Sequence, residues 1–153
     1  MSLNIHQWAA IAIGLMAMVI AFMDWVPTPL NHNIHGMSVR ERLPSTLIHS
    51  TLGVIFAVAN ALVIKWLILI GAIWYSLVLV QAIRNWWVAY FAGIYWGEIS
   101  PENYAQHYAN NLTILPRIQG HPVTPDVQHM LIHLTVLAAS ALSWVSFWMA
   151  SAL

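Results

Sequence analysis

The chain alternates long apolar runs with short polar segments, and the apolar runs are longer than those of a soluble domain. The first run covers 6–26, the second covers 45–93 and the third covers 125–152. A transmembrane helix needs about 20 mostly apolar residues. The first and third runs therefore each predict one membrane-spanning helix.

The central run is long enough for two helices. Its 49 residues would form a single helix of about 73 Å, more than twice the thickness of the hydrocarbon layer. The run therefore predicts a hairpin of two spans, near 45–64 and 67–92. The polar residues Asn60 and Lys65 mark the favoured turn, and Gly71 is the alternative break.

Helix-start signals precede the last apolar run. Thr124 is a candidate cap, Pro125 suits the first helical position, and Asp126 suits the positive end of the helix dipole. These residues predict a fourth span over 125–152, whose first two turns lie in or just beneath the headgroup layer.

The loop 94–123 carries a similar start signal. Ser100 and Pro101 precede a segment whose apolar and aromatic residues recur at helical spacing. The residues that share this side are Tyr104, Tyr108, Leu112 and Leu115. The pattern predicts a short amphipathic helix that lies on the membrane surface.

Together these elements predict an all-α fold: a four-transmembrane-helix bundle with a short amphipathic interfacial helix between the third and fourth helices. The whole chain, 1–153, forms a single integral membrane domain. Composition agrees, because 60% of the residues are hydrophobic and 7% are charged, against roughly 45–50% and about 25% in soluble domains. The N-terminal run lacks a basic leader, so we expect it to be a retained helix.

Charge and cysteine content exclude several functions. Five basic and five acidic residues give a formal net charge of zero, so no basic patch favours nucleic acid. The absence of cysteine excludes disulfides, thiolate metal sites and iron–sulfur clusters. The lipid bilayer is the expected partner, together with a homo-oligomer or a larger membrane complex.

The distribution of basic residues predicts an orientation. Four spans place both termini on one side and the two long loops on the other. The long-loop side carries Arg40, Arg42, Arg84 and Arg117, whereas the opposite side carries Lys65. By the positive-inside rule the long loops lie in the cytoplasm.

The same threading gathers the polar residues at the long-loop end. Every histidine except His6 falls on that side. These histidines are His32, His35, His49, His107, His121, His129 and His133. Intramembrane polar side chains turn toward the bundle interior and toward one another, so we expect a polar site at this end.

Three helices supply the candidate site residues. His129 and His133 share one face of the last helix with Asp126, and His49 lies on the second helix. Imidazole binds divalent transition metals or haem iron, and a carboxylate orients such a ligand. The predicted metal ligands are therefore His49, His129, His133 and Asp126. The predicted cofactor-binding residues form a stripe on the third helix, Gln81, Arg84 and Asn85.

Two further functions fit the same sequence, and whether the protein is an enzyme stays open. Small residues such as Gly14 and Ala17 permit close helix contact, which favours an assembly or binding subunit without catalysis. The other function is an enzyme or carrier that acts on an anionic lipid-like substrate, in which Arg84 binds the head group and a histidine acts as base. Two histidines four residues apart lack the glutamate of the zinc-protease motif, so the spacing alone does not choose among these functions.

Three segments resemble a group of uncharacterised small bacterial four-helix integral membrane proteins. The segments are "RNWWVAYFAGIYWG" (84–97), "YAQHYANNLTILP" (104–116) and "TPDVQHMLIHLTVL" (124–137). The residues that carry the resemblance are Trp86, Trp87, Tyr90, Gly93, Leu115, Pro116, Pro125, His129 and His133. The resemblance implies a bacterial inner-membrane setting and no particular activity.

Overall fold

The computed structural model of the chain describes residues 2–97 and 99–150, and within them it is helical without a β-strand. The long helices are α1 (Ile5–Trp25), α2 (Val39–Ala61), α3 (Lys65–Ala82) and α6 (Val127–Ala150). The short elements are the 3₁₀ helix η1 (His32–His35), the π-helical turn η2 (Ile83–Trp87), α4 (Val88–Ala92) and α5 (Pro101–His107).

Four helical stretches are long and apolar enough to cross a membrane. They are Ile5–Trp25, Val39–Ala61, Lys65–Ala92 and Val127–Ala150, the third being α3, η2 and α4 in continuous succession. The four spans and the central hairpin predicted from the apolar runs are thereby confirmed as helices. The predicted end of the last span, at 152, lies outside the described residues.

The second helix begins at Val39, six residues before the predicted start at Ser45. Glu41 sets this start, because its carboxylate accepts hydrogen bonds from the Ser38 backbone N–H and hydroxyl, both at 2.7 Å. This is the Ser-x-x-Glu capping box. Pro44 lies inside the helix, so the helix includes the last part of the polar segment that precedes the second apolar run.

The turn between α2 and α3 consists of residues 62–64, and Val63 has a left-handed φ of 55°. The hairpin therefore turns just after Asn60, as favoured from the sequence. The alternative break at Gly71 is wrong, because Gly71 lies within α3. A Cβ on Gly71 would lie 3.0 Å from the ring of Phe56, so this glycine serves the close approach of α2 and α3.

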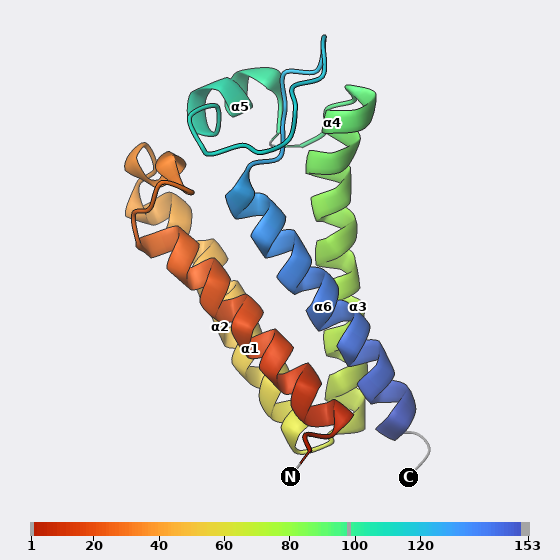
Figure 1. The fold of residues 1–153 in the computed structure, drawn as a ribbon. Coiled ribbons are helices and arrows are strands. Elements are labelled where there is room, and N and C mark those ends of the chain that lie inside the picture. The colour runs from red at the N-terminus through yellow and green to blue at the C-terminus, as the bar shows by residue number, and fades with distance from the viewer. Residues whose placement is uncertain (1, 98, 151–153) are drawn as a thin grey trace.

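The long helices pack as a bundle in which α1 lies against both α2 and α6, and α6 lies against α3. Both termini lie at one end of the bundle, here called the terminal end (Figure 1). The opposite end, here called the loop end, carries η1, α5 and the connection into α6. The buried core of the bundle includes Ile13, Met16, Phe56, Tyr75 and Val136.

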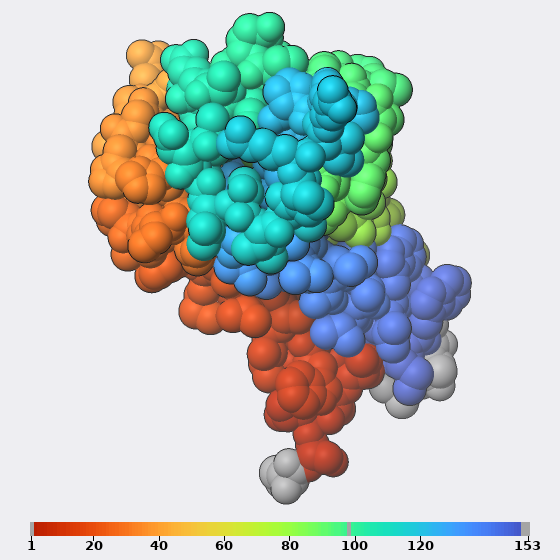
Figure 2. All heavy atoms as spheres, turned by 45° about the horizontal axis from the view of Figure 1, so that its top comes forward, coloured from red at the N-terminus to blue at the C-terminus, as the bar shows by residue number. Residues whose placement is uncertain are grey.

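The loop end has its own small core beneath α5. Trp86 and Tyr104 are buried there with Ile99 and Val123. The Ser100 hydroxyl caps α5 by accepting from the Asn103 N–H at 3.1 Å, as predicted. In Figure 2, α5 and the following segment cover this end of the molecule.

The predicted interfacial helix is shorter than expected. It ends at His107, and the turn Tyr108–Asn111 breaks the helical spacing. Leu112 and Leu115 therefore do not continue the face that begins at Tyr104. The Asn111 side chain accounts for the break, because it turns inward and is 5% exposed.

We predict that Gly53→Ala destabilises the protein, because a Cβ at Gly53 would lie 2.7 Å from the Cβ of Ala17. Overpacking of this kind costs about 1–3 kcal/mol of unfolding free energy. Gly14→Ala is the matched control, since no atom lies within 4 Å of its added Cβ, and the helix propensity of alanine favours it. Unfolding by dodecyl sulfate titration from dodecyl maltoside micelles measures both. Equal stability of the two variants would contradict the α1–α2 contact.

Candidate functional site

The start of α6 is fixed by Asp126. Its Oδ1 accepts the His129 backbone N–H at 2.8 Å, which is the N-cap interaction, and also lies 2.8 Å from His129 Nδ1. Thr124 was predicted to cap this helix, and that prediction is wrong. The helix begins at Val127, so Asp126 stands immediately before it and Pro125 precedes the cap.

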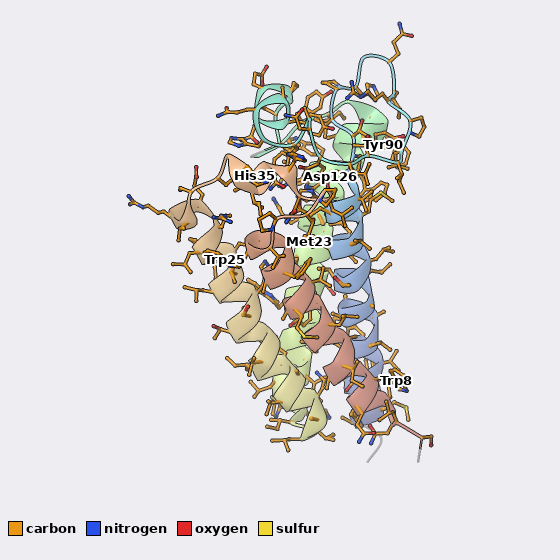
Figure 3. The ribbon with its side chains drawn as sticks, turned by 60° about the vertical axis from the view of Figure 1, so that its left-hand side comes forward. Trp8, Met23, Trp25, His35, Tyr90 and Asp126 are labelled. Atoms are coloured by element: carbon orange, nitrogen blue, oxygen red, sulfur yellow. The ribbon has the colours of Figure 1, made fainter. Side chains whose placement is uncertain are left out.

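Asn111 connects three parts of the loop end. Its Nδ2 donates to Asp126 Oδ2 at 2.8 Å and to Asn33 Oδ1 at 3.1 Å, while its Oδ1 accepts the Asn33 N–H at 3.0 Å. All three side chains are buried. The amide thus joins η1, the segment after α5 and the start of α6. Figure 3 shows Asp126 at the loop end of the bundle, opposite Trp8.

The imidazole of His129 is held on two sides. The ring stacks on Trp86 at 3.8 Å between centroids with 28° between planes, and meets the edge of Tyr108 at 5.2 Å. A carboxylate only accepts hydrogen bonds, so Nδ1 carries the hydrogen shared with Asp126. In the neutral ring, Nε2 therefore keeps its lone pair as a proton acceptor.

The Asp126 carboxylate is fully buried, with 0% exposure. Burial alone raises its pKa, but the charge of His129 and the hydrogen bonds from His129 and Asn111 outweigh burial, so the pKa lies below its ordinary value of 3.8. The carboxylate is therefore ionised at neutral pH. It acts as an acceptor that orients the His129 ring.

A second polar group occupies the ends of α1 and α2. The Thr46 hydroxyl donates to Asp24 Oδ2 at 2.6 Å, and Arg42 Nη1 donates to the Asp24 carbonyl oxygen at 2.8 Å. The guanidinium of Arg42 lies over the Trp25 ring at 4.8 Å. These contacts tie the loop-end turns of the two helices together.

A polar cavity of about 270 Å³ lies between these two groups. Side chains of α1, α2, η1 and α6 wall it, with Tyr108 at one edge. The polar and charged residues that line it are Asp24, Asn33, Glu41, Arg42, Ser45, His49, Tyr108, Gln128 and His129. Two buried nitrogens in this wall, Arg42 Nε and His49 Nδ1, have no hydrogen-bond partner among the described residues.

His133 was predicted to join His129, but it faces elsewhere. Trp87 Nε1 donates to its Nδ1 at 3.1 Å, and the ring lines an apolar groove between α3 and α6 rather than the polar cavity. The His129 and His133 rings lie 6.1 Å apart between centroids. Only His49 and His129 of the three helix histidines therefore reach the cavity.

The four predicted metal ligands lie in different surroundings at the loop end. Within residues 2–97 and 99–150, no three histidine or acidic side chains are placed to hold a metal ion. The structure therefore gives no support to a metal group of His49, His129, His133 and Asp126, and metal binding by these residues stays a prediction. The reason is that Asp126 is occupied by His129 and Asn111, while His133 is turned toward Trp87.

The predicted cofactor-binding stripe also faces away from the cavity. Arg84 is exposed with its guanidinium 5.1 Å from the Trp96 ring, and Gln81 donates to Asn85 at 3.2 Å on the surface. The π-helical turn η2 inserts extra backbone into the helix, which alters the α-helical register. On this part of the helix Trp86 is the side chain that turns inward. The arginine that lines the polar cavity is Arg42, not Arg84.

The terminal end holds a separate polar cluster. The Ser146 hydroxyl donates to Asn60 Oδ1 at 2.6 Å, so it accepts from His6 Nδ1 at 2.8 Å. This chain joins α1, α2 and α6, and it places His6 opposite the other histidines, as predicted. The apolar core separates this cluster from the polar cavity.

Over the described residues, the fold and the site define a class: a small helical protein with four helices long and apolar enough to cross a membrane and a polar cavity at its loop end. Comparisons with protein-family models, curated proteins and solved structures gave no match. The chemistry of the cavity is therefore the guide to function.

Proposed function

We propose that the chain is a multi-pass protein of a bacterial inner membrane, with the loop end in the cytoplasm. Four apolar helices support the crossings, and four arginines at the loop end against Lys65 at the terminal end support the orientation. In this arrangement α5 lies at the membrane interface, and the polar cavity opens near the lipid headgroups.

We propose further that the cavity binds a phosphate group, carried by a lipid headgroup or by a small soluble molecule. The observation that supports this most directly is the pair of buried nitrogens without partners, Arg42 Nε and His49 Nδ1. Buried donors are normally satisfied, and an anion with several acceptor oxygens satisfies the arginine while matching its charge.

Two acidic side chains also line the cavity, and their negative charges oppose part of the attraction of Arg42 for an anion. Glu41 is held by Ser38, and Asp24 accepts from Thr46, so each carboxylate already has a donor. On the opposite wall, His129 Nε2 accepts a hydrogen bond from a phosphate hydroxyl or an adjacent alcohol. Arg42, His49 and His129 would therefore contact one ligand from α2 and α6.

The small residues that favoured an assembly subunit have a role within the chain. Ala17 and Gly53 bring α1 and α2 into close contact, which accounts for part of this pattern without a second chain. Binding of a phosphate group is therefore the function that the geometry supports best.

We predict that Arg42→Gln weakens phosphate binding at least tenfold, because a charge-assisted hydrogen bond contributes about 1.5–3 kcal/mol. Arg40→Gln is the matched control: it removes the same charge from the same helix at an exposed position outside the cavity. Isothermal titration of the protein in dodecyl maltoside with inorganic phosphate and with dihexanoyl phosphatidylglycerol measures both variants.

The two probes separate the sources of the phosphate. Tighter binding of the phospholipid indicates a headgroup site, and equal or tighter binding of inorganic phosphate indicates a soluble ligand. Failure of both probes to bind the unaltered protein would overturn the proposal. Equal weakening by the Arg40 and Arg42 variants would also overturn the proposal, because it would show that the anion is attracted by the overall surface charge and not bound in the cavity.

A further inference from the structure

A second hollow lies against α6. It is a groove of about 600 Å³ between α3–α4 and α6, and it shares no lining residue with the polar cavity. Its walls are almost entirely apolar, with Leu79, Trp87 and Phe91 on one side and Leu137 on the other. Phe91 and Leu137 are exposed at its mouth, so the groove opens toward the surface that faces lipid.

One polar side chain lines this apolar groove. His133 is 8% exposed, and its Nδ1 accepts the hydrogen of Trp87 Nε1 at 3.1 Å. An indole nitrogen only donates, so Nδ1 carries no hydrogen and the ring proton lies on Nε2. The structure thus fixes the tautomer of His133 with Nε2–H as donor, and this donor has no hydrogen bond to a described residue.

The depth of His133 narrows the class of acceptor. It stands six residues after Val127, the first residue of α6, which is about 9 Å along the helix axis. The 24-residue helix spans about 36 Å, so His133 lies about 6 Å inside a centred hydrocarbon layer of about 30 Å. Phospholipid ester groups lie at the boundary of that layer. A molecule that accepts a hydrogen bond from His133 must therefore have a head group apolar enough to enter the hydrocarbon layer.

The aromatic wall of the groove favours a ligand with a planar head group. The rings of Trp87 and Phe91 lie 6.0 Å apart with 24° between their planes, and both line the groove. Aromatic side chains in this arrangement offer a stacking surface to another planar ring. A planar conjugated ring with a carbonyl oxygen would stack here and accept the hydrogen of His133 Nε2.

We propose that this groove binds a lipid-soluble quinone, with its ring against Trp87 and Phe91, a carbonyl oxygen on His133 Nε2–H, and its apolar tail in the bilayer. This site is separate from the phosphate site, because the two hollows share no lining residue. Each can fail without the other.

Binding of decylubiquinone to the purified full-length protein in dodecyl maltoside tests this proposal. His133→Phe removes the donor and should weaken binding at least tenfold, whereas His133→Gln retains both a donor and an acceptor and should stay within about threefold. Leu137→Trp fills the groove and should abolish binding. Leu131→Trp, an exposed position of the same helix outside the groove, should leave binding unchanged.

The remaining outcomes would overturn the proposal. These are no binding of decylubiquinone to the unaltered protein, equal binding by His133→Phe and the unaltered protein, or full displacement by an equimolar amount of phosphatidylethanolamine. Displacement by phosphatidylethanolamine would show that the groove binds lipids without selecting a quinone. If His133→Phe does not give a monodisperse helical protein, the Leu137 and Leu131 pair decides the test.

Discussion

Replacing Asp126 with alanine is expected to lower the free energy of unfolding by about 3–5 kcal/mol, because it leaves several buried donors without their acceptor, each at a cost of about 1–3 kcal/mol. The carboxylate is fully buried and accepts from the His129 backbone, the His129 ring and Asn111. Its removal uncaps α6 and leaves the Asn111 amide without its strongest acceptor. Dodecyl sulfate titration in dodecyl maltoside, followed by circular dichroism, measures the loss.

Asp126→Asn separates the cap from the charge. It keeps one oxygen for the His129 N–H, but it turns an amide toward the Asn111 Nδ2 donor, so we expect an intermediate loss. A loss below about 1 kcal/mol for the alanine variant, the scale of an ordinary helix cap, would show that the connection through Asn111 does not hold the loop end together.

The same carboxylate makes stability dependent on acid. The pKa of Asp126 is lower in the folded protein than its ordinary value of 3.8, so the ionised form stabilises the fold above that value. This stability is lost as the pH falls from 3.8 through the lower, folded pKa. In Asp126→Asn this part of the acid dependence should disappear, which thermal unfolding between pH 5 and pH 2 would reveal.

Trp86→Ala should have a comparably large effect, about 3–5 kcal/mol, because it removes a large side chain from a packed core. Trp86 is 5% exposed and contacts His129, Tyr104 and Tyr108. It is therefore both the centre of the loop-end core and the platform for the His129 ring. The variant should lose stability and also weaken any binding that depends on His129.

Trp66→Ala is the control for this prediction. Trp66 is 73% exposed, and its loss should change the unfolding free energy by less than about 1 kcal/mol, as is usual for surface positions. Unfolding of both variants by dodecyl sulfate titration gives the comparison. Similar losses for the two tryptophans would contradict the assignment of Trp86 to a buried core.

The architecture could be predicted from the sequence because the thickness of the bilayer sets the length of each membrane-spanning helix. The 49-residue central run had to fold back on itself, and the turn was correctly placed after Asn60. The start of α2 was missed because the prediction followed the apolar run, which begins at Ser45, whereas the Ser38–Glu41 capping box starts the helix at Val39. The resemblance to small bacterial membrane proteins stays a prediction.

The candidate site could be predicted only in part. Helical spacing correctly paired Asp126 with His129 on one face of α6, since their contact is local. Spacing could not show that η2 departs from α-helical geometry, and so Arg84 was assigned to the interior. Asn33 and Asn111 were missed because their contact joins residues 78 apart in the chain, and no local pattern reports such a pair.

Cysteine labelling can test the membrane topology, on which the placement of both proposed sites depends. The chain has no cysteine, so Ser2→Cys and Gln119→Cys each introduce a single thiol, one at the terminal end and one at the loop end. In intact bacterial cells, a membrane-impermeant maleimide should label Ser2→Cys at once and Gln119→Cys only after lysis. Labelling of both thiols from the same side would contradict the placement of the two ends of the bundle on opposite sides of the membrane. It would also contradict the proposal that the polar cavity lies at the cytoplasmic end.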